Sequence, residues 1–90
     1  MSEALASKAD RRLGVVGVVI EDRLATAPRV QDVLTKHGDL IVGRMGLPYK
    51  ERDVSVIALI VDGTTDEIGS LCGRLGSIPG VTVKSALTPR

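Results

Sequence analysis

Apolar residues form two nearly unbroken runs in this chain, at residues 13–20 and 54–61. Runs of this length without polar alternation are typical of strands that are buried on both faces. Residues 40–46 and 81–87 mix apolar residues with polar ones or glycine and predict two further strands. Residues 47–53 are predicted as the polar turn region that ends the strand at 40–46.

Residues 26–38 have the pattern of an amphipathic helix. Thr26 is the candidate N-cap, Pro28 falls in the first turn, and Gly38 follows the last turn. The spacing of three and four residues that marks one face of a helix is shared by Val30, Val33, Leu34 and His37.

A second helix is predicted from Thr64 to the Pro79-Gly80 pair. Thr64 and Glu67 have the spacing of a capping box, in which each side chain bonds the other residue's backbone N–H. One side of this helix is apolar, formed by Ile68, Leu71, Cys72 and Leu75, and a glycine stripe beside it consists of Gly69, Gly73 and Gly76. Since each glycine in a helix costs about 1 kcal/mol relative to alanine, we expect a neighbouring backbone or a ligand close to this flank.

The predicted order is strand, helix, strand, strand, helix, strand. It indicates an α+β fold, the ferredoxin-like βαββαβ arrangement, with a four-stranded antiparallel sheet and both helices on one face. The two most apolar strands then lie in the middle of the sheet. Residues 13–90 are expected to form one domain, and the small, polar residues 1–12 a flexible N-terminal arm.

The central strands are apolar on both faces, although the helices cover only one. The uncovered face is predicted to carry Val15, Val19, Val54, Val56, Ala58 and Ile60. If so many aliphatic side chains stayed in water, at roughly 1.5–3 kcal/mol each, the loss would rival the net stability of the domain, about 5–15 kcal/mol. We therefore expect a homodimer or homotetramer that joins through the sheet, with closure of this face by residues 1–12 as the alternative.

Composition narrows the function. The 90 residues are 43% hydrophobic, with Tyr49 as the only aromatic residue, so the core is aliphatic. The net charge is +1, and the basic residues are scattered along the chain without a cluster that would mark a nucleic-acid surface. Cys72 is the only cysteine, which excludes an internal disulfide and a thiolate-only metal cluster. We expect a cytoplasmic protein that needs no cofactor and does not enter a membrane.

Two segments could bind a small effector. Arg44 lies near Gly46 and Tyr49, and a guanidinium beside bare backbone suits a carboxylate or another small anion. The start of the second helix adds Thr64, Thr65 and Gly69, with backbone N–H groups that favour anions. Two acidic residues in the same helical turn weaken a phosphate site there, and an ordinary strand end explains the first segment equally well.

No catalytic or metal-binding set is predicted. His37 falls at a helix end, where a cation suits the negative pole, and Cys72 is expected as a small buried hydrophobic residue. With a single histidine and a single cysteine on separate helices, no catalytic triad can be argued and no metal ligand set is expected.

Three blocks, "IVGRMGLPY", "VSVIALIVDGTTDEIGSLCGRLG" and "IPGVTVKSAL", resemble a family of regulators associated with the iron-only hydrogenase system. Its members are ACT-like domains similar to the C-terminal domain of the nickel-responsive ribbon-helix-helix repressor. The resemblance implies a non-catalytic module of transcription regulation that oligomerises through its sheets, senses a small molecule at a subunit interface and works with a regulatory protein partner. Nickel is not carried over, because the histidines and cysteines that hold it there are missing.

The alternative is a nucleic-acid-binding regulator that acts directly or through a partner. Ferredoxin-like domains that bind RNA stack bases on aromatic residues of the sheet, and the predicted strands here lack them. About twelve residues precede the first predicted strand, so we do not expect the DNA-binding segment of the repressor. An acylphosphatase-like enzyme is disfavoured, because that chemistry uses an asparagine and the sequence has none.

Overall fold

The computed structural model describes residues 11–21 and 25–89. Most of the predicted N-terminal arm, residues 1–10, lies outside them. The elements in chain order are β1 (Arg11–Glu21), α2 (Thr26–Lys36), the 3₁₀ turn η1 (Gly38–Leu40), β2 (Ile41–Tyr49), the 3₁₀ turn η2 (Lys50–Arg52), β3 (Val54–Thr64), α3 (Thr65–Gly76) and β4 (Val81–Leu87). None of the helices within these residues is long and apolar enough to cross a membrane.

The four strands form one antiparallel sheet in the order β2-β3-β1-β4. The predicted ferredoxin-like topology is confirmed, with the two most apolar strands in the centre. β1 and β3 pair over their whole lengths, from Arg11 opposite Thr64 to Glu21 opposite Val54. β1 begins two residues before the predicted start, since Arg11 and Arg12 also pair with β3.

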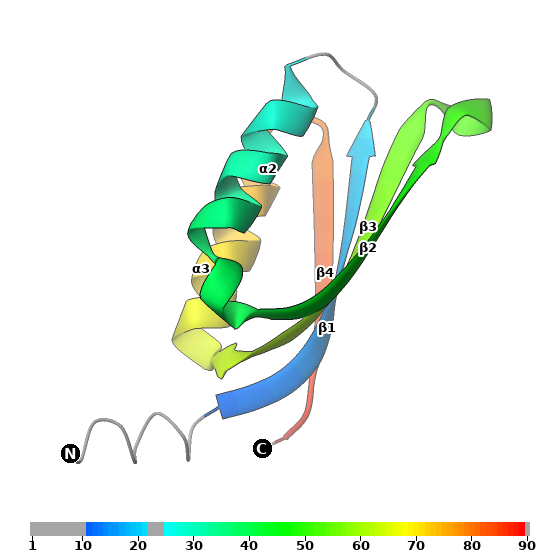
Figure 1. Cartoon of the computed structure of the whole chain (residues 1–90). Coiled ribbons are helices and arrows are strands. Elements are labelled where there is room, and N and C mark those ends of the chain that lie inside the picture. Colours follow the sequence, from blue (N-terminus) through cyan, green and yellow to red (C-terminus); the bar gives the residue numbers. More distant parts are fainter. Residues whose placement is uncertain (1–10, 22–24, 90) are drawn as a thin grey trace.

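Both helices pack on the same face of the sheet, and the other face is bare (Figure 1). The core between the two layers is aliphatic, as predicted. It consists of Val16, Val18, Ile20, Val30, Leu34, Leu40, Ile57, Leu59, Val61, Ile68, Leu71, Leu75 and Ile78. With no ring to fill space, this core depends on the close fit of branched side chains from alternate strand positions and one stripe of each helix.

Helix α2 starts differently from the prediction. Its N-cap position is Ala25, which makes no side-chain capping bond, and Thr26 is the first helical residue. Thr26 is only 4% exposed. The predicted cap at Thr26 is therefore wrong, because this side chain is packed inside the first turn.

Strand β2 begins one residue later than predicted, at Ile41, and ends three residues later, so that it includes Leu47, Pro48 and Tyr49. A central strand forms backbone hydrogen bonds to a neighbour on each side, and a proline has no N–H to donate to either neighbour. β2 pairs only with β3, so Pro48 is tolerated at this edge. The turn region is correspondingly shorter, and it includes Asp53 in the left-handed conformation, with φ of 52°.

The glycines of α3 do not serve close packing within the chain. A Cβ added at Gly69, Gly73 or Gly76 would have no described atom within 4 Å. The expectation of a neighbouring backbone from the same chain is therefore wrong. The close approach lies instead at Gly14, where a Cβ would stand 2.7 Å from the carbonyl oxygen of Ala86 on β4.

Candidate functional site

The bare side of the sheet is the most distinctive surface of the described chain, and we call it the open face. Paired residues of an antiparallel ladder point to the same side, so the register assigns its members. Its central members are Leu13, Val15, Gly17 and Val19 of β1, Gly43, Met45, Leu47 and Tyr49 of β2, Val54, Val56, Ala58 and Ile60 of β3, and Thr82, Lys84 and Ala86 of β4. The same register places charged residues at its two ends, Arg11 and Asp62 at one and Glu21 at the other.

The open face is strongly apolar. Eight of its large apolar side chains are between 37% and 73% exposed: Leu13, Val15, Val19, Met45, Leu47, Tyr49, Val56 and Ile60. Monomeric proteins rarely expose a contiguous apolar surface of this kind unless it contacts a partner or a ligand. The six predicted interface residues all lie on this face.

The open face is also hollowed. A groove of about 430 Å³ lies between β1, β3 and β4, where Leu13, Val15, Ile60 and Ala86 form part of its wall. A second hollow of about 260 Å³ lies over Gly43 and Ala58. Small residues at these places leave room that another molecule's side chains can fill.

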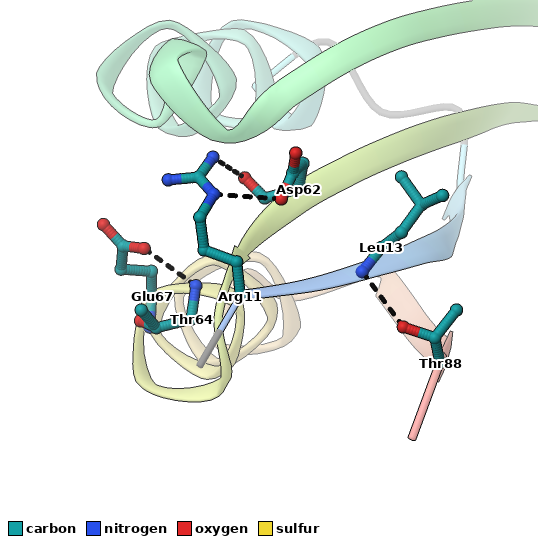
Figure 2. Close-up of polar contacts among 6 residues, drawn as sticks. All are labelled: Arg11, Leu13, Asp62, Thr64, Glu67 and Thr88. Carbon is teal, nitrogen blue, oxygen red and sulfur yellow. Dashed lines mark hydrogen bonds and ion pairs between the residues drawn. The ribbon is translucent and has the colours of Figure 1, made fainter. Parts of the chain in front are cut away.

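One end of the open face carries a polar border (Figure 2). Arg11 Nε donates to Asp62 Oδ1 at 3.0 Å, and its Nη2 donates to the Asp62 carbonyl at 2.8 Å. On the β4 side, the Leu13 N–H donates to Thr88 Oγ1 at 3.2 Å. Such half-exposed ion pairs contribute little stability, about 0–1 kcal/mol, but they mark where the apolar surface ends.

The start of α3 has the predicted capping box (Figure 2). The Thr64 N–H donates to Glu67 Oε1 at 2.8 Å, and the Glu67 N–H donates to Thr64 Oγ1 at 3.1 Å. The backbone N–H of Thr64, helped by its hydroxyl and by the charge of Arg11, lowers the pKa of Glu67 from its ordinary value of 4.5. The two N–H groups of the capping box are therefore already bonded, and the negative charge of Glu67 disfavours a second anion at this helix end.

The predicted effector residues on β2 point in different directions. Arg44 is opposite Leu59 and faces the helices, where its Nη2 donates to Gln31 Oε1 of α2 at 3.0 Å. Gly46 also faces the helix side, whereas Tyr49 lies on the open face opposite Val54. Arg44 thus links the edge strand to α2.

The six predicted effector residues do not form one site within one chain. Tyr49 pairs at the start of β3, and Thr64 ends that strand. Ten residues of strand separate these points by roughly 30 Å. A single small molecule cannot touch both Tyr49 and Thr64 in one chain. Arg44 pairs with Leu59 midway along β3 but faces the helices, and Thr65 and Gly69 follow Thr64 on α3.

The surroundings of His37 and Cys72 indicate roles in holding the fold together. His37 caps α2, and its Nδ1–H donates to the Val33 carbonyl at 2.8 Å. Burial raises the pKa of the Cys72 thiol, against a smaller effect of its hydrogen bond with Ser85, so the thiolate form is disfavoured at neutral pH. In the described part of the chain, no three His, Cys, Asp or Glu side chains gather as a metal site.

Sequence reasoning missed the contribution of β2 to the open face. The prediction ended this strand at Gly46, so Leu47 and Tyr49 were not assigned to a face. The alternation of Gly43, Met45, Leu47 and Tyr49 was the available signal. It was obscured by Pro48, which usually argues against a strand.

Comparison with known proteins places the chain in a family. The TM1266-like family model, described as "Iron-only hydrogenase system regulator, putative", matches residues 12–85. The structure of the uncharacterized protein TM1266 from Thermotoga maritima is 34% identical, with a TM-score of 0.84 over 86% of this chain and 96% of that one. No curated protein matches the sequence significantly.

More distant structures share the fold alone. The ACT domain of GTP pyrophosphokinase from Chlorobium tepidum has a TM-score of 0.68 at 19% identity, over 84% of this chain and 99% of that one. The regulatory subunit of aspartate kinase from Thermus flavus has a TM-score of 0.53 at 20% identity, over 89% of this chain and 53% of that one. The fold is ACT-like, and with the family match over residues 12–85 the chain belongs to the TM1266-like family of iron-only hydrogenase system regulators.

Proposed function

We propose that this protein is a non-catalytic regulatory module of the iron-only hydrogenase system, active as a homodimer or homotetramer joined through the open face. The observation that carries the proposal is the apolar open face itself. Its exposed aliphatic side chains, such as Val15, Val56 and Ile60, gain more from mutual burial than from hydration. A second copy presents the same surface, so two open faces can pack against each other about a two-fold axis.

The distribution of charge on the open face supports self-association. Lys84 lies on the outer strand β4, and the Arg11–Asp62 pair lies at one end. The centre is formed by residues such as Val15, Ala58 and Ile60. An apolar centre with a polar rim is the usual anatomy of a protein interface.

We further propose that a small effector binds where subunits meet. Of the predicted effector residues on β2, only Tyr49 lies on the open face, whereas Arg44 faces the helices and is hydrogen-bonded to Gln31. An effector held between two open faces would therefore contact Tyr49 and need both subunits. Effector binding would then favour assembly, and assembly would favour effector binding. In this way a non-catalytic domain can convert a change in ligand concentration into a change in its oligomeric state. Any effect on transcription would be exerted through the assembled form and a protein partner.

Ile60→Lys tests the interface. Light scattering should show an oligomer for the wild type at micromolar concentration and a monomer for the variant, because each copy would bury a charge in the apolar centre. Ser70→Lys, which places the same charge on the exposed surface of α3, should remain oligomeric. A wild-type monomer at that concentration, or an oligomeric Ile60→Lys protein with an unchanged circular dichroism spectrum, would contradict the proposal.

A further inference from the structure

A groove lies on the helix layer, between the first turns of α2 and the end of α3. Its walls include Pro28, Arg29 and Val33 of α2, Arg74 of α3, and Ile78 of the segment that follows α3. Its volume is about 440 Å³, within the range of small-molecule sites. We propose that this groove binds a small organic anion with two negative charges, either a phosphate monoester or a dicarboxylate.

Two guanidinium groups supply the charge. Arg29 and Arg74 come from different helices and line the same groove. Neither makes an ion pair or a side-chain hydrogen bond with any of residues 11–21 and 25–89. Asp32 is the acidic residue of the lining, and its Oδ2 is 3.0 Å from Lys36 Nζ. The groove therefore holds positive charge that its own carboxylate does not neutralise, and guanidinium groups suit two-oxygen contacts with phosphate or carboxylate.

Apolar side chains define the rest of the ligand. Ile78 belongs to the core, and Val33 packs against it. Together with Pro28 they form an apolar wall beside the two arginines. A purely inorganic anion would leave this wall in contact with water, whereas an organic anion can cover it with carbon atoms. This favours an organic anion over phosphate or sulfate ions alone.

The lining of the groove belongs to α2, α3 and the residues just after α3. These helices lie on the opposite side of the sheet from the open face (Figure 1). The groove stays accessible when two sheets pack face to face. The inference is therefore independent of the proposed self-association, and either one can fail without the other. The groove is also distinct from the predicted site around Arg44, whose guanidinium donates a hydrogen bond to Gln31.

The experiment titrates the full-length protein with phenyl phosphate, succinate and inorganic phosphate at constant ionic strength, followed by calorimetry and amide chemical shifts. We expect saturable binding of phenyl phosphate or succinate, at least about tenfold tighter than inorganic phosphate, with shifts around residues 28–33 and 74–78. The double variant Arg29→Gln/Arg74→Gln should lose at least about tenfold in affinity, as expected when charge-assisted hydrogen bonds are removed.

Lys50→Gln/Arg52→Gln is the matched control, because both residues lie on the turn η2, outside the groove, and their removal changes the net charge by the same two units as the double groove variant. It should bind like the wild type. The thermal midpoints of all variants without ligand should agree, which separates binding from folding. Absence of saturable binding by both organic probes, unchanged affinity in the double groove variant, or an equal loss in Lys50→Gln/Arg52→Gln would overturn the proposal.

Discussion

Thr64 and Glu67 hold the first turn of α3 with two reciprocal hydrogen bonds of 2.8 and 3.1 Å. The bond from the Thr64 N–H is stronger to a carboxylate than to a carboxylic acid, and this lowers the pKa of Glu67. A lowered native pKa means that the stabilisation is present above the unfolded pKa and is lost as pH falls through the native value. The cap therefore weakens in acid.

We predict that wild-type protein loses more stability between pH 7 and pH 3 than Glu67→Gln does. Glutamine can still accept the Thr64 hydrogen bond but does not titrate, so its cap does not change with pH. The difference should be at most about 1 kcal/mol, the usual contribution of a helix cap. Urea unfolding at both pH values measures it. Asp66→Asn serves as the control in the same turn, and a Glu67→Gln protein with the wild-type pH dependence would contradict the prediction.

At the scale of elements, β2 is shaped by one extra residue. Ile41 pairs with Val61 on the helix side, but a register shift follows, and Gly43 pairs with Ile60 on the open face. Val42 is the additional residue, a bulge that reverses which side each later residue faces. Without it, Met45 and Leu47 would point toward the helices as Ile41 does. The bulge thus adds the apolar side chains of β2 to the open face.

This register predicts that substitutions at two adjacent positions of β2 have different effects on self-association. Leu47→Lys should reduce self-association by at least about tenfold, because the lysine enters the apolar surface. Gly46→Lys should leave it nearly unchanged, because position 46 faces the helix side and a Cβ there has no described atom within 4 Å. Sedimentation equilibrium measures both. If Gly46→Lys dissociated the protein and Leu47→Lys did not, the assigned register would be wrong.

For the whole molecule, the proposed assembly links stability to concentration. If the open faces bury one another only in the folded state, association stabilises folding by mass action. The thermal midpoint should therefore rise with protein concentration across a hundredfold range, and Ile60→Lys should have a lower midpoint that does not change with concentration. Scanning calorimetry at several concentrations provides the test. A wild-type midpoint independent of concentration would argue against assembly through this face.

Much of the fold could be predicted because its signals are local. The apolar runs of β1 and β3 indicated central strands, and the pair Thr64 and Glu67 located the start of α3. These patterns depend on residues close together in the chain. The start of α2 was less predictable, because Thr26 is a good N-cap by type but is packed in the first turn.

The candidate sites were harder to predict, because they depend on residues far apart in the sequence. Arg44, Tyr49 and Thr64 all belong to the paired strands β2 and β3. The ladder nevertheless places Tyr49 and Thr64 at opposite ends of β3, and Arg44 on the other side of the sheet from Tyr49. The groove between α2 and α3 left no signal, since Arg29 and Arg74 are ordinary solvent-side residues of two separate helices.

The amino-acid order alone established the six elements, the central position of β1 and β3, the aliphatic core and the apolar character of both faces of those strands. Hydrophobic periodicity and capping act over a few residues, so they can be recognised without coordinates. Tertiary packing fixed the bulge at Val42, the open surroundings of the α3 glycines and the placement of Arg29 and Arg74 along one groove. Register and helix packing are set by the fit of distant surfaces, which no local pattern contains.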